Sequence, residues 1–104
     1  ELLENEYLYP FIAIIYIEAL AGQGDDEKAR ELLPYIFDVK LDGYEPHVQT
    51  RLLLQQGMAY AVLGEKEKAN EISLKVHELI VSLGLKDLEV RYEFQKLQKL
   101  LEEE

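Results

Sequence analysis

The stretch 24–32 reads GDDEKAREL and returns further along the chain as GEKEKANEI at 64–72. Five of the nine positions are identical, and a period of about 40 residues is typical of proteins built from stacked helices. The leading glycine allows a sharp turn between two helices, and the carboxylates after it favour the positive end of the next helix. The alanine that follows allows two helix backbones to approach closely. The repeat therefore predicts antiparallel helix pairs.

Apolar residues on both sides of these stretches recur at spacings of three and four, which is the helical period. We therefore predict an all-α fold of about five helices in one domain spanning 1–104. The first helix pair is expected at 6–43, the second at 46–83, and a C-terminal helix at 86–104, which is either a cap or the start of a third unit. Pro46 suits a first helical position, Gly84 a left-handed helix end, and Pro34 is expected to kink the second helix.

The run LQQGMAYAVLGEKEKA at 54–69 resembles a tetratricopeptide repeat. The family pattern has a small residue, an aromatic residue, a turn glycine and an alanine, and here these places are occupied by Gly57, Tyr60, Gly64 and Ala69. The first unit has only the turn glycine and the alanine. The repeat is longer than the usual period of about 34 residues, as in long variants of the family. The resemblance implies a right-handed stack of antiparallel helix pairs in which the first helix of each pair lines a concave groove.

The resemblance also implies which side chains line that groove. They are Phe11, Ile14, Ile15 and Glu18 in the first unit, Arg51, Leu54, Gln55 and Met58 in the second, and Arg91, Phe94, Gln95 and Gln98 in a third. Arg51 and Arg91 stand one repeat period apart and are expected on one face, which predicts a locally basic groove in an acidic protein. The alternative for Phe11, Ile14, Leu54 and Phe94 is a role in the core between helices.

Composition narrows the classes of function. The chain has 21 Asp and Glu against 11 Lys and Arg, a formal charge of −10, which disfavours nucleic acid as a direct partner. No segment is apolar enough to span a membrane, and the absence of cysteine excludes thiolate chemistry and favours a cytoplasmic location. The two histidines, His47 and His77, belong to no metal-binding or catalytic spacing. We therefore expect no cofactor, no metal and no catalysis.

The function that these observations favour is binding of another protein or of a peptide through the concave face. Two alternatives remain open. The helix around 11–20 is apolar nearly all round, so it can pair with a second copy to form a homodimer, or face a preceding repeat. The chain can also be an effector-sensing or oligomerisation domain of a larger transcriptional or signalling regulator. Its start at Glu1 suggests a fragment of a longer chain.

Overall fold

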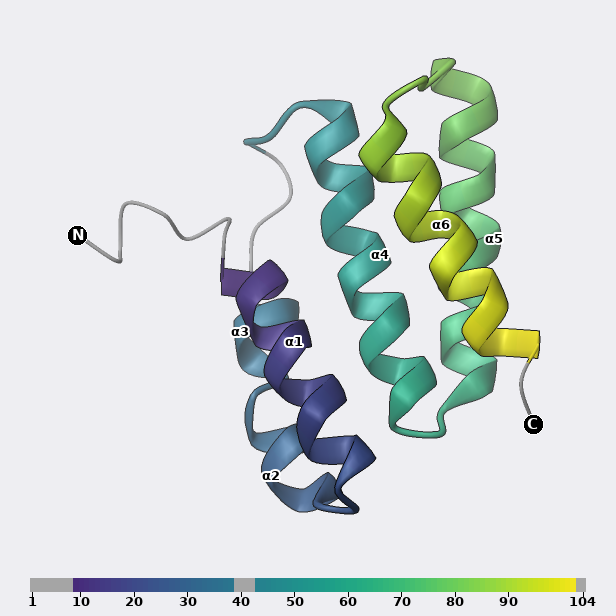
Figure 1. The fold of residues 1–104 in the computed structure, drawn as a ribbon. Coiled ribbons are helices and arrows are strands. Elements are labelled where there is room, and N and C mark those ends of the chain that lie inside the picture. Colours follow the sequence, from purple (N-terminus) through teal and green to yellow (C-terminus); the bar gives the residue numbers. More distant parts are fainter. Residues whose placement is uncertain (1–8, 39–42, 103–104) are drawn as a thin grey trace.

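The fold is all-α throughout the part of the chain that the computed structural model describes, residues 9–38 and 43–102 (Figure 1). The helices are α1 (Tyr9–Gly22), α2 (Asp26–Glu31), α3 (Pro34–Phe37), α4 (Pro46–Val62), α5 (Lys66–Leu83) and α6 (Leu88–Glu102). The second predicted helix is divided into α2 and α3 at Pro34, as its missing N–H and bulky ring predict. Counting α2 and α3 as one broken helix gives the five predicted. The expected boundary segments 6–8, 39–42 and 103–104 lie outside the described residues.

The two glycine turns of the sequence repeat have the same backbone conformation. Gly24 and Gly64 have φ angles of 84° and 86°, a region that only glycine occupies without strain. The amide after each glycine donates to a carbonyl five residues back, at 2.9 and 2.8 Å. The alanines of the repeat, Ala29 and Ala69, are both fully buried. The repeat in sequence is therefore a repeat in structure at these turns.

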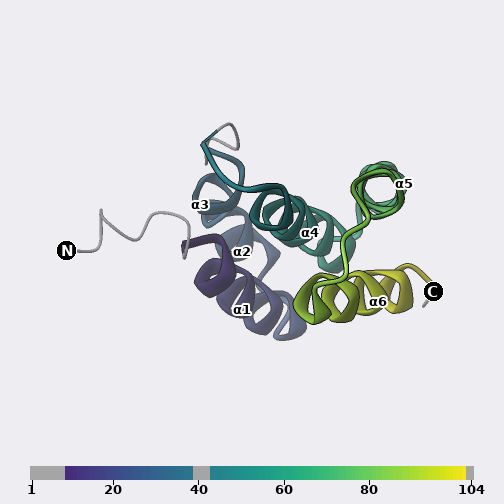
Figure 2. The same cartoon turned by 90° about the horizontal axis from the view of Figure 1, so that it is seen from above.

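Helix α4 is the centre of the molecule. It packs against α1 and α3 on one side and against α5 and α6 on the other (Figure 2). Its side chains are accordingly buried around most of its circumference, and Leu52, Leu54 and Ala59 are not exposed at all. Helices α1 and α6 both flank α4 and come close enough for an ion pair, in which Lys96 Nζ lies 3.4 Å from Glu18 Oε2. The three helices α1, α4 and α6 thus surround a common space.

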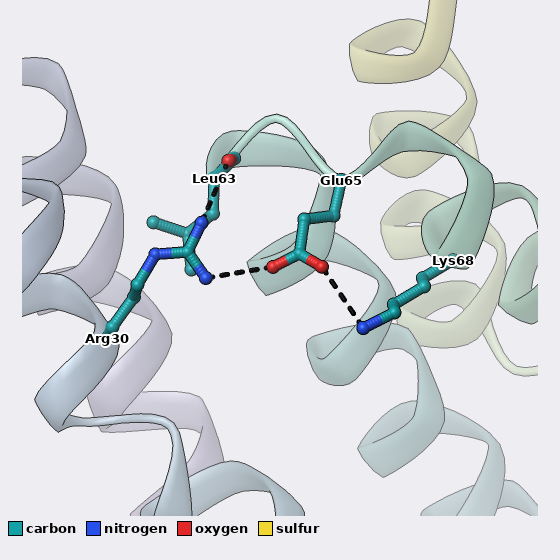
Figure 3. Close-up of polar contacts among 4 residues, drawn as sticks. All are labelled: Arg30, Leu63, Glu65 and Lys68. Carbon is teal, nitrogen blue, oxygen red and sulfur yellow. Dashed lines mark hydrogen bonds and ion pairs between the residues drawn. The ribbon is translucent and has the colours of Figure 1, made fainter.

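A polar contact joins the first helix pair to the turn of the second (Figure 3). Arg30 of α2 donates from Nη1 to Glu65 Oε2 at 2.9 Å and from Nη2 to the Leu63 carbonyl at 3.5 Å. Lys68 lies 3.2 Å from the other carboxylate oxygen of Glu65. The bond from Arg30, with help from Lys68, lowers the pKa of the Glu65 carboxyl below its usual value. The two units are therefore held together by charge as well as by apolar packing.

Candidate functional site

A hollow of about 210 Å³ opens between α1, α4 and α6. Its lining comprises Phe11, Ile14, Ile15, Glu18, Arg51, Gln55, Met58, Tyr92, Glu93 and Lys96. The floor is apolar, because Ile14 and Met58 are almost completely buried. The rim is more open, with Ile15 63% and Tyr92 69% exposed. This arrangement offers an apolar depression whose edges carry polar groups.

Arg51 is held in place at one edge of the hollow. Its Nε and Nη2 donate to the two carboxylate oxygens of Glu93 at 3.1 and 2.9 Å, which joins α4 to α6. The guanidinium also lies 4.5 Å from the ring centroid of Phe11 on α1, a cation–π contact. The bond to Glu93 raises the pKa of Arg51 above its usual value, although partial burial opposes this. One side chain of α4 thus contacts both flanking helices.

Gln55 supplies a polar group at the base of the hollow. Its side chain is 1% exposed, and its Nε2 donates to the Arg51 carbonyl one turn earlier at 3.2 Å. The hollow therefore has a buried amide beside its apolar floor.

The charges around the hollow balance. Arg51 and Lys96 are the cations, and Glu93 and Glu18 are their carboxylate partners. The predicted local excess of positive charge is therefore not found at this hollow. The cations are nevertheless the more exposed members, with side chains 31% and 45% exposed against 16% and 28% for their partners.

The structure brings most of the predicted groove residues together, although not all. Phe11, Ile14, Glu18, Arg51, Gln55 and Met58 line the hollow, as does Ile15. Leu54 is fully buried in the core. Phe94 turns toward α5, where its ring stacks on His77 at 6.0 Å. Arg91 is exposed and donates to the Leu85 carbonyl at 3.4 Å, outside the hollow.

The reason for this difference is the register of α6. Its hollow-lining residues are Tyr92, Glu93 and Lys96, whereas the 40-residue period places Arg91, Gln95 and Gln98 there. Arg91 precedes Glu93 by two residues, which turn a helix through about 200°, so the Arg91 side chain lies on the opposite side of α6. The signal that could have revealed this is the stripe of α6 that includes Val90 and Leu97, both fully buried.

A second depression, of about 340 Å³, shares Glu18 with the hollow and is lined by Glu18, Ala21, Gly22, Ala61, Val62, Lys66 and Leu100. A larger depression of about 500 Å³ runs along the outer side of α6, but its lining comes from that helix alone, which cannot surround a ligand. No three His, Asp or Glu side chains within 9–38 and 43–102 are grouped to hold a metal ion. In the same segments, no helix combines the length and apolarity that crossing a bilayer requires.

No model of a protein family, no curated protein and no solved structure matches this chain. Its function is therefore inferred from the chemistry of the hollow and of the helix surfaces.

Proposed function

We propose that this chain is a non-catalytic binding module that receives a segment of another protein in the hollow between α1, α4 and α6. The observation that carries the proposal is an apolar floor, formed by Ile14 and Met58, inside a rim of polar side chains fixed by two ion pairs. Buried apolar anchors inside a polar rim are the usual anatomy of protein interaction sites.

We further infer a tetratricopeptide-like stack. Each of α1 and α4 packs on the helices that follow it, and α4 also contacts α1 and α6. The repeated glycine turns and buried alanines support the same arrangement. In such a stack α1, α4 and α6 are the first helices of successive units, and the hollow lies on their concave side.

The size of the hollow favours a protein segment over a small molecule. Pockets for drug-sized ligands measure about 300–1,000 Å³, whereas this hollow of about 210 Å³ accommodates one or two side chains. An aliphatic or aromatic side chain suits the apolar floor.

Met58 allows a direct test, because it is the only methionine of the chain and lines the hollow. Peptides selected from a library of random short sequences on the immobilised chain would be titrated into protein carrying a ¹³C-labelled methionine methyl group. We expect bound peptides to shift the single methyl resonance. Peptides enriched in the selection should carry an aliphatic or aromatic residue.

The matched variants are Tyr92→Glu at the rim and Leu74→Glu on α5. These side chains are 69% and 68% exposed, so both changes are tolerated by the fold, and only Tyr92 lines the hollow. Tyr92→Glu should weaken peptide binding at least tenfold, whereas Leu74→Glu should bind as the unmodified chain does. Equal binding by both variants, or peptides that leave the Met58 resonance in place, would exclude the hollow as the binding site.

A further inference from the structure

The second depression continues the hollow along the same three helices. Helices α1, α4 and α6 run in the same direction (Figure 1), and each of them contributes residues to both spaces. On α4 the lining passes from Met58 to Ala61, and on α6 it passes from Lys96 to Leu100. Steps of three and four residues correspond to about one helical turn, a rise of about 5–6 Å. The two spaces are therefore successive parts of one groove.

An ion pair marks the boundary between the two spaces. Glu18 of α1 lines both of them, whereas Lys96 of α6 lines the hollow and not the second depression. Lys96 Nζ lies 3.4 Å from Glu18 Oε2, so the pair reaches from one flanking helix to the other. A compact ligand is confined to one side of this pair. A peptide segment with two suitably spaced side chains can reach both sides.

The second depression has room for a larger side chain than the hollow has. Its volume is about 340 Å³ against about 210 Å³, because Ala21, Gly22 and Ala61 in its lining are small. Its floor is apolar, since Ala21, Ala61, Val62 and Leu100 are half-buried and pack against the core. An aromatic side chain suits this space, and a smaller aliphatic side chain suits the hollow.

The charges of the chain favour a partner segment that is uncharged inside the groove and basic outside it. The two spaces are lined by the pairs Arg51–Glu93 and Lys96–Glu18 and by Lys66, so no excess of carboxylates faces an inserted side chain. The chain as a whole has a formal charge of −10. The field of the whole molecule steers partners of opposite charge and speeds their association. Lysine or arginine residues beside the inserted side chains are therefore complementary to this protein.

We propose that the hollow and the second depression bind one basic segment of a partner protein through two apolar side chains. An aliphatic side chain enters the hollow, and an aromatic side chain enters the second depression. This inference rests on the proposed function, because it names the partner of the same site.

The separation of the two spaces sets the spacing of the two apolar side chains. Met58 and Val62 lie four residues apart on α4, and Ile14 and Ala21 lie seven apart on α1. These steps correspond to about 6 Å and about 10 Å along the helices. Residues two and three positions apart in an extended chain are about 7 Å and about 10 Å apart, and residues four positions apart on a helix are about 6 Å apart. The two side chains therefore lie two to four positions apart in the partner.

A second methyl reporter tests whether the second depression is occupied. Gly22 lines it and has no positive φ, and a Cβ added there meets nothing within 4 Å, so Gly22→Met is tolerated. Peptides selected on the immobilised chain should shift the methyl resonance of Met58 and the one added by Gly22→Met at the same peptide concentration. Gly43→Met is the control, because an added Cβ is equally free there and Gly43 lines neither space. Its added resonance should stay in place.

Peptide variants separate this inference from the proposed function. Replacing the aromatic residue by alanine should weaken binding about tenfold or more, and at saturation only Met58 should still respond. Replacing the flanking lysines by glutamates should weaken binding severalfold, and added salt should reduce this difference. Peptides that shift Met58 but not the methyl group of Gly22→Met, or that bind equally well with glutamate flanks, would overturn this inference and leave the proposed function standing. Peptides that shift neither resonance would exclude both.

Discussion

At the scale of single residues, Arg51 is a charged side chain of the hollow that links α4 to both α1 and α6. It lies over Phe11 of α1 and binds Glu93 of α6 through two nitrogens. A bidentate guanidinium–carboxylate pair fixes both partners geometrically, which a lysine cannot do. Arg51 is therefore a structural link between three helices as well as part of the rim of the hollow.

Reversing the charge of Arg51 should destabilise the fold. Arg51→Glu places a carboxylate against Glu93, whose side chain is only 16% exposed. We expect a loss of about 1–2 kcal/mol, between the values for exposed and for buried pairs. Glu93→Arg alone should be similarly harmful, and the double exchange should recover most of the loss in urea unfolding. Arg91→Glu is the control, since Arg91 is exposed and outside the hollow. An equal loss for Arg91→Glu would refute the special role of Arg51.

At the scale of elements, the decisive contact is the close approach of α4 to its neighbours at Gly57. A Cβ atom built there would lie 2.9 Å from Leu97 Cδ2 on α6 and 3.0 Å from Ile72 Cγ2 on α5. The absence of a side chain at one position of α4 therefore sets how near two helices can pack. Leu97 is fully buried, so it has little freedom to move aside.

Gly57→Ala should destabilise the protein by about 1–3 kcal/mol through overpacking, despite the better helix propensity of alanine by about 1 kcal/mol. Thermal and urea unfolding would measure the change. The matched control is Gly22→Ala at the end of α1, where an added Cβ meets nothing within 4 Å and should leave stability unchanged or slightly higher. If Gly57→Ala leaves the free energy of unfolding unchanged, then α5 and α6 adjust to the added methyl group without loss of stability.

At the scale of the whole molecule, the seam between the first helix pair and the second combines apolar and charged contacts. The rings of Phe37 and Tyr60 lie 4.9 Å apart, and Lys68 lies 5.4 Å from the Tyr60 ring centroid. Beside them Arg30, Glu65 and Lys68 form the polar contact of Figure 3. The carboxylate of Glu65 belongs to the turn of one unit and is held by a cation of the other.

This seam predicts a pH dependence. Because the pKa of Glu65 is lowered in the folded state, its carboxylate contributes in full to the free energy of unfolding above the unfolded pKa of 4.5. This contribution is lost as the pH falls through the folded pKa. The melting temperature of the unmodified chain should exceed that of Glu65→Gln near neutral pH, and the difference should disappear on acidification below that unfolded value. Glu67→Gln, a change at an exposed position two residues away, should show no such convergence. If the difference in melting temperature between Glu65→Gln and the unmodified chain does not vary with pH, this would count against the ion pair.

Much of the fold could be predicted from local sequence. Gly24, Gly64 and Gly84 adopt the left-handed backbone that turns and helix ends require, and Pro46 begins α4. Pro34 divides the second helix, and Asp25 caps its start by accepting a bond from the Lys28 amide at 3.3 Å. These features depend on contacts within a few residues, so the sequence alone was sufficient to predict them.

The candidate site was predictable only in part, and the limit has a physical reason. The groove places that the tetratricopeptide resemblance implies include Phe11, Ile14 and Glu18, and likewise Arg51, Gln55 and Met58, and the structure brings these six residues to one hollow. The rotation of one helix relative to another is set by side-chain packing between distant segments. Tertiary structure therefore decided that α6 turns Glu93 rather than Arg91 toward the hollow. It also decided that Leu54 belongs to the core, because α4 is enclosed by its neighbours.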